Sequence, residues 1–126
     1  MQTITLANLG KKSAQEVFEY IATHLLTQRK KCGVTRNGNF SCQYKYKNLR
    51  CAAGALFGPY EYKHAYEGVT WSGLRRNGIV TSAHFNLICA LQDVHDDYEP
   101  DEWGRKLREI GDIRQLSIGF ISALEK

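Results

Sequence analysis

Cys51 is the residue whose type and position are best suited to covalent chemistry. It follows Arg50 at the point where a strand is predicted to meet a helical turn, and helix-terminal amides and a neighbouring cation both lower the pKa of a thiol. A base is also needed, and His95 beside Asp96 is a candidate because a carboxylate can orient an imidazole. The small side chains after Cys51 equally fit a crowded helix entry. This packing interpretation is favoured over a Cys51-dependent hydrolase or transferase.

A metal site is the second kind of chemistry that the sequence raises. Asp93, Asp96 and Asp97 are neighbours on one predicted helix, and His95 or His84 could add an imidazole. His95, however, lies on the apolar stripe of that helix, where a core histidine bonded to a carboxylate or carbonyl is the more common arrangement. The four cysteines form no C-x-x-C pair. We therefore expect neither a metal site nor a cofactor.

Cations and tyrosines alternate along a predicted hairpin and raise the possibility of nucleic-acid binding. Lys45, Lys47 and Arg50 could contact phosphates, and Tyr44 and Tyr46 could stack on bases. The alternation of a strand places the tyrosines and lysines on opposite faces. On that basis the two groups are not expected to line one groove, and nucleic-acid binding is kept as an alternative.

The segment from Tyr60 to Gly78 is rich in aromatic residues and glycine without clear periodicity, and it is predicted to form loops with short helical turns. Aromatic and arginine side chains often anchor protein interfaces and ligand pockets. The alternative for most of the rings is core filling. The binding candidates in this loop set are Tyr60, Tyr62, Glu67, Trp71, Arg75 and Arg76.

Composition indicates an ordinary globular protein. The 126 residues are 43% hydrophobic and 24% charged, which fits a single domain over residues 1–126. No leader-like start or long apolar stretch is present, so a cytoplasmic protein with reduced thiols and no membrane partner is expected. The net charge is +4. Cations dominate before residue 93 and carboxylates dominate from residue 93 on, which is consistent with an anionic partner, with pairing of the two parts within the fold, or with an ordinary solvated surface of mixed charge.

Periodic apolar residues predict helices around a hairpin. Ser13 and Glu16 form a capping box that begins the first long helix. A second helix is expected to begin at Thr81 or Ser82, and Pro100 marks the first turn of a third.

The remaining boundaries complete the predicted fold. Gly111 is expected to end the third helix, and Asp112 is expected to cap a last one. Alternation over residues 40–47 predicts one half-buried strand, which turns at Lys47-Asn48 into a short return strand through Leu49 to Cys51. The predicted class is α+β, with a small antiparallel hairpin or sheet packed against about four helices.

Two motifs resemble those of an uncharacterised family of small tailed-phage and prophage proteins. The first, K/R-C-A-x-G-x-L, corresponds to Arg50–Leu56, and the second, L-x-x-V-H-D, corresponds to Leu91–Asp96. This chain departs from the pattern at Phe57-Gly58-Pro59. The resemblance carries no known activity or cofactor. It implies a small accessory or host-takeover protein made in an infected bacterium. Together with the split charge and the lack of a complete catalytic set, it leads us to expect a non-enzymatic protein of the host bacterial cytosol that binds a host protein or complex and inhibits antiviral defence in an anti-CRISPR, anti-restriction or signal-sponging manner. An anionic small ligand is a further possibility.

Overall fold

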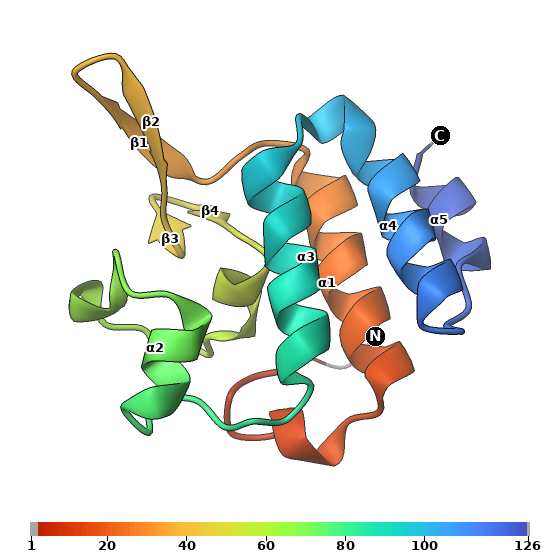
Figure 1. Cartoon of the computed structure of the whole chain (residues 1–126), viewed down its shortest axis with the longest axis horizontal. Coiled ribbons are helices and arrows are strands. Elements are labelled where there is room, and N and C mark those ends of the chain that lie inside the picture. Colours follow the sequence, from red (N-terminus) through yellow and green to blue (C-terminus); the bar gives the residue numbers. More distant parts are fainter. Residues whose placement is uncertain (1–2, 126) are drawn as a thin grey trace.

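The computed structural model describes residues 3–125 and confirms an α+β architecture of five helices and two small antiparallel sheets. Helices α1 and α3 lie side by side at the centre (Figure 1). Helices α4 and α5 lie to one side of them, while the hairpins and the short helix α2 lie to the other. The helices are α1 Ala14–Gln28, α2 Trp71–Arg76, α3 Phe85–Asp97, α4 Trp103–Ile113 and α5 Gly119–Leu124. The strands are β1 Gly33–Arg36, β2 Asn39–Cys42, β3 Lys45–Tyr46 and β4 Leu49–Arg50.

Helix α1 begins at the predicted capping box. The Ser13 hydroxyl accepts a hydrogen bond from the Glu16 amide at 3.1 Å, and the Glu16 carboxylate accepts one from the Ser13 amide at 2.9 Å. These two contacts satisfy amides that a helix start leaves without partners. The inward stripe of α1 is buried and includes Phe18 and Leu25. The predicted capping box is thus confirmed. It could be predicted from the sequence because Ser13 and Glu16 lie within one helical turn.

Helix α3 begins later than predicted. Its first residue is Phe85, and the preceding His84 has a left-handed backbone conformation with φ of 54°. The Thr81 hydroxyl instead accepts a hydrogen bond from the Ala83 amide at 3.3 Å, so it stabilises a turn before the helix. The inward stripe of the helix matches the predicted one except for His84 and Tyr98, which were also expected on it and lie just outside the two ends of the helix. It consists of Leu87, Ile88, Leu91, Val94 and His95, all buried.

The prediction that Gly111 ends a helix is wrong. Helix α4 passes through Gly111 and Asp112 to Ile113, so Asp112 caps no helix. A β-carbon at position 111 would collide with the side chain of Ile118, and Phe18 is also close. Gly111 is therefore a close-packing residue that lets the chain after α4 approach the helix. The predicted start at Pro100 is confirmed as a 3₁₀ turn leading into α4.

The continuous strand predicted over residues 40–47 is absent from the described chain, which has two separate hairpins in this region. Strand β1 pairs with β2 around a turn at Asn37-Gly38, where both residues have positive φ. Strand β3 pairs with β4 around Lys47-Asn48, with Lys45 opposite Arg50. The break falls at residues 43–44. Strand β1 was not predicted, because its four residues lack a clear alternation of polar and apolar side chains.

One cluster of buried apolar side chains connects the helices to the hairpins. It extends from α1 and α3 into the 3₁₀ turn Ala53–Leu56 and reaches Trp71 and Trp103. Among residues 3–125, no helix has the length and apolar character needed to cross a membrane.

Candidate functional site

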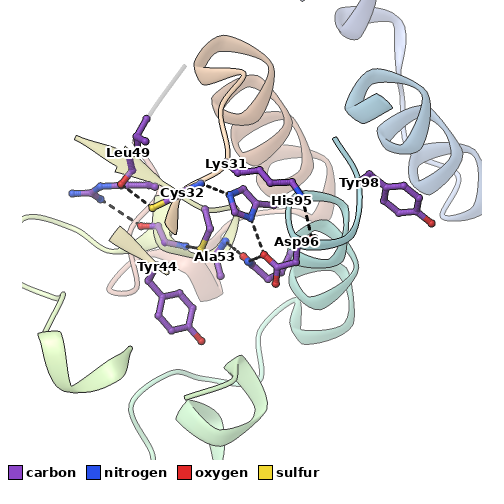
Figure 2. Close-up of polar contacts among 12 residues, drawn as sticks. Lys31, Cys32, Tyr44, Leu49, Ala53, His95, Asp96 and Tyr98 are labelled. Atoms are coloured by element: carbon purple, nitrogen blue, oxygen red, sulfur yellow. Dashed lines mark hydrogen bonds and ion pairs between the residues drawn. The ribbon is translucent and has the colours of Figure 1, made fainter. Parts of the chain in front are cut away.

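The His95 imidazole is fully buried and both of its nitrogens are engaged (Figure 2). Its Nε2 accepts a hydrogen bond from the Cys32 amide at 2.8 Å, so the ring proton must lie on Nδ1. Nδ1 donates to the Asp96 carboxylate at 2.7 Å. The ring also stacks on Trp103 with centroids 5.6 Å apart. His95 therefore ties the entry of β1 to α3, in the manner of a core histidine, and has no nitrogen available to act as a base on a ligand.

The Cys51 side chain does not have the surroundings of an activated nucleophile. It is 1% exposed, and burial raises the pKa of its thiol despite a hydrogen bond from the Gly54 amide at 3.3 Å. The Arg50 guanidinium, expected to lower that pKa, donates instead to the carbonyl of Phe57 at 2.6 Å. Burial of Cys51 and the hydrogen bonds already made by His95, Asp96 and Arg50 argue against the catalytic alternative for Cys51, His95 and Asp96. Arg50 is likewise a structural cap for the turn after Cys51.

A possible metal group in the described chain consists of Cys42, His95 and Asp96, whose ligand atoms lie within 4.8 Å of one another. Both nitrogens of His95 are already hydrogen-bonded, and Asp96 accepts from His95 and Gln92 at 2.7 Å each. The pKa of Cys42 is raised to about 12, first by burial and then by the adjacent Asp96 carboxylate. Its neutral thiol can donate to Asp96. This cluster is accounted for by a hydrogen-bond network.

Burial by itself would raise the pKa of Asp96. Hydrogen bonds from His95 and Cys42, and then from Gln92, outweigh burial and lower that pKa. Gln92 also accepts from the Ala53 amide at 2.8 Å, so the network connects α3 with the turn after Cys51. His84, considered as a ligand from sequence, lies at the opposite end of α3 and contacts the carbonyl of Lys12 at 2.6 Å.

Glu67, predicted as a binding residue, organises the junction between the hairpins and the loops. Its carboxylate accepts hydrogen bonds from the amides of Tyr44 and Lys45, at 2.8 and 3.1 Å, and from the Tyr62 hydroxyl at 2.6 Å. These contacts hold the chain at the break between β2 and β3. A nonlocal carboxylate therefore replaces the ladder hydrogen bonds that a continuous strand would make.

Most rings of the loop set fill space around Phe57. Trp71 is 4% exposed and packs against Phe57 and Tyr44, so most of its ring fills space in the core, and its predicted binding role stays a prediction. Tyr62 is half-buried against Phe57. Tyr60 is 97% exposed.

The two arginines of the loop set differ. Arg75 lies over the Phe85 ring, with its guanidinium carbon 3.7 Å from the centroid. Arg76 is exposed at the end of α2. Only Tyr60 and Arg76 in this set therefore present side chains that are mainly exposed.

A basic groove of about 400 Å³ runs beside the two hairpins. Lys45 lies over the Tyr62 ring at 5.6 Å, and Lys47 lies over the Tyr46 ring at 5.4 Å. The groove thus contains cations and tyrosines together, which corrects the prediction of opposite faces. The reason is that strand pairing is interrupted before β3 and that Lys47 has a left-handed backbone conformation. Side chains therefore do not simply alternate between two faces along residues 40–47. The lining residues are Val34, Arg36, Gln43, Lys45, Tyr46, Lys47, Tyr62 and His64.

A second hollow, the acidic cavity, has a volume of about 340 Å³ and lies between α3 and the loop that enters α2. Three carboxylates and several aromatic or sulfur-containing side chains surround it, and it has no Lys, Arg or His in its lining. Those residues are Cys42, Tyr44, Cys51, Glu67, Gly68, Val69, Thr70, Trp71, Ser72, Cys89, Gln92, Asp93 and Asp96.

Sequence reasoning missed parts of both hollows. Arg36 is near the basic hairpin in the sequence and His64 belongs to the loop segment, but only the hairpin and loop arrangement brings both into one groove with Lys45. Asp93 and Asp96 were noticed as a helical cluster, but the opposite wall of their cavity comes from residues about twenty positions earlier. No family model, curated protein or solved structure matches this chain.

Proposed function

We propose that this is a non-enzymatic binding protein that engages an anionic partner through the basic groove. The observation that carries the proposal is the convergence of Arg36, Lys45 and Lys47 on one hollow without a carboxylate in its lining. Within residues 3–125 none of these three cations forms an ion pair. Uncompensated cations in a concave surface raise the local concentration of anions and steer their approach.

The partner proposed first is an acidic surface of a host protein. In the phage setting that the sequence resemblance implies, such a protein would be a cytoplasmic component of antiviral defence, and binding would inhibit it. The exposed ring of Tyr60 and the exposed Arg76 are further contacts available to a protein partner. Aromatic and arginine side chains commonly dominate the energetics of protein interfaces.

Single-stranded nucleic acid is the second candidate, because cations and tyrosines share the groove. Lys45 and Lys47 could contact phosphates while the edges of Tyr46 and Tyr62 contact bases. Both lysines lie over the tyrosine faces, however, so a base would have to displace a cation before it could stack. This competition is why an acidic protein surface is preferred.

Two defined probes test the proposal: an oligo-aspartate peptide for the acidic protein and an oligo-thymidine strand for the nucleic acid. Binding of each is measured by fluorescence anisotropy with the wild-type chain and with the double variant Lys45→Glu/Lys47→Glu. The matched control is Lys11→Glu/Lys30→Glu, which makes the same change in net charge at exposed positions outside the groove.

We expect the groove variant to lose about tenfold or more in affinity for the probe that binds, and the control to lose much less. Affinity should fall as salt is added, with a logarithmic slope of about −2 for a nucleic acid that contacts three cations. Equal losses in the groove variant and the control would contradict the proposal, as would the absence of binding to both probes. Preference for one probe decides between the two partners.

A further inference from the structure

The acidic cavity is a second candidate binding site, distinct from the basic groove. Its volume of about 340 Å³ is at the lower end of the range for small-molecule sites. One wall comes from α3 and the other from residues 67–72, so two segments distant in sequence meet at the cavity. A cavity of this size admits a compact organic group rather than a polymer.

The three carboxylates of the cavity differ in how many hydrogen bonds they accept. Glu67 accepts hydrogen bonds from two amides and a hydroxyl. Asp96 accepts from His95 and Gln92. Asp93 is an exposed residue at the edge of α3, and within residues 3–125 it has no hydrogen-bond donor and no cation partner, so its charge is solvated when no ligand is bound. The negative charge available to a ligand is therefore that of Asp93.

The pKa of Asp93 reflects this isolation. It is raised first by burial and then by the nearby carboxylates of Asp97 and Asp96. Arg75 is close enough to lower the pKa of the neighbouring Cys89, but it is already placed over the Phe85 ring. The repulsion at Asp93 thus has no compensating cation in the cavity lining, and a positively charged group would relieve it.

Apolar surface complements this charge. Tyr44, Val69, Trp71 and Cys89 line the cavity, and Tyr44 is fixed by donation from its hydroxyl to the Val69 carbonyl. The Trp71 side chain is 4% exposed, and its Nε1 is a buried donor without an acceptor among residues 3–125. Buried donors are nearly always paired in folded proteins. This donor calls for an acceptor, which an ammonium or guanidinium group cannot be, so it is the apolar ring of Trp71 and not its Nε1 that complements a cationic ligand.

We propose that the acidic cavity binds a small organic cation, a primary ammonium or guanidinium group on a short apolar body. The charged group would pair with Asp93, and the apolar body would contact Tyr44, Val69 and Trp71. The same chemistry could come from a free amine or from a lysine side chain of a protein. A polyvalent metal ion is a poorer match, because the Asp96 side of the cavity is already occupied by hydrogen bonds.

The test is an NMR titration of the wild-type chain with phenethylamine, with 2-phenylethanol and phenylacetate as neutral and anionic probes of similar shape. We expect the amine to shift the resonance of the Trp71 indole N–H and those of backbone amides around Asp93, and to bind about tenfold or more tightly than either comparison probe. A capped Gly-Lys-Gly peptide distinguishes the two sources. Binding as tight as that of phenethylamine assigns a protein side chain as the ligand, and weaker binding assigns a free amine.

The variant Asp93→Asn should weaken amine binding by about tenfold or more. Asp97→Asn is the matched control, because Asp97 is, like Asp93, an exposed carboxylate, lies one helical turn away and does not line the cavity. It should retain affinity within about twofold. Cys89→Leu, which adds carbon atoms at the cavity wall, should also reduce binding without changing any charge.

The proposal is overturned if phenethylamine produces no shifts around Asp93, if phenylacetate binds as well as the amine, or if Asp93→Asn binds the amine normally. Its failure is distinguishable from failure of the groove proposal. The Lys45→Glu/Lys47→Glu variant should bind the amine like the wild type, because neither lysine lines the acidic cavity.

Discussion

The basic groove and the acidic cavity adjoin at one short segment but have opposite charge. Tyr44 lines the cavity and the next residue, Lys45, lines the groove. Tyr44 lies at the bend between β2 and β3, and there two adjacent positions supply two unlike surfaces. Glu67 accepts hydrogen bonds from both of their amides. One backbone junction, held by a single carboxylate, therefore positions two sites of different chemistry.

The two hollows also differ in how much of their charge is already neutralised. The groove cations have no ion-pair partner within residues 3–125, whereas two of the three cavity carboxylates accept several hydrogen bonds each. Most of the cavity charge therefore contributes to the fold, and Asp93 is the exception. Changes in the groove should alter binding with little effect on stability, while most changes in the cavity should alter stability first.

The largest expected effect comes from breaking the junction that the two hollows share. Glu67→Ala leaves the amides of Tyr44 and Lys45 and the hydroxyl of Tyr62 without their acceptor. We expect the free energy of unfolding in urea to fall by roughly 3 kcal/mol, because each unpaired group that stays buried costs about 1–3 kcal/mol. Glu67→Gln, which keeps one acceptor oxygen, should lose less. Wild-type stability of Glu67→Ala would show that the junction does not depend on this carboxylate.

A smaller loss of unfolding free energy is expected for Asp96→Asn, and it distinguishes Asp96 from Asp93. Because the folded pKa of Asp96 is lowered, its carboxylate adds stability above the ordinary value of 3.8, and this is lost as pH falls through the lowered pKa. Asp96→Asn should therefore lose about 1–2 kcal/mol at neutral pH and progressively less below 3.8, measured by denaturant unfolding.

Asp93 supplies the matched comparison, because its pKa shift has the opposite sign. A raised folded pKa means that the fold loses stability as pH rises from 3.8 through that pKa. Asp93→Asn should abolish this loss and be at least as stable as the wild type at neutral pH. If the two variants were equally destabilised, the distinction between a structural and a ligand-directed carboxylate would be wrong.

The smallest expected effect comes from removing the Tyr62 hydroxyl, on the groove side of the Glu67 junction. Tyr62→Phe removes one hydroxyl bonded to Glu67 but retains the ring beneath Lys45. We expect a loss of about 1 kcal/mol in unfolding free energy, the usual contribution of one hydrogen bond. Affinity of the groove for its anionic probe should change little. A large loss of affinity with unchanged stability would instead make the Tyr62 hydroxyl a direct contact to the partner.

Features encoded within one turn or one helix were predictable from sequence. The capping box at Ser13 and the inward position of His95 both follow from local spacing. The break between β2 and β3 was not predictable, because it depends on Glu67 from a distant loop. Gly111 was misread for a similar reason. Its missing side chain accommodates Ile118 rather than ending the helix.

The candidate sites were only partly visible in the sequence for the same physical reason. Lys45 and Lys47 were identified by their charge, but Arg36 and His64 join them through tertiary structure. Cys51 was singled out by its position at a helix entry, yet burial decides its chemistry by raising the pKa of its thiol. Residue type and spacing therefore indicated which groups to consider, and burial and nonlocal partners determined what each group can do.

The most direct test of the proposed function compares the affinity of Lys45→Glu/Lys47→Glu with that of Lys11→Glu/Lys30→Glu for the anionic probe at low salt. Both variants carry the same net charge, so a difference between them reports where the charge lies. The groove account predicts that the first variant binds about tenfold or more weakly than the second. Equal affinity of the two variants would contradict it.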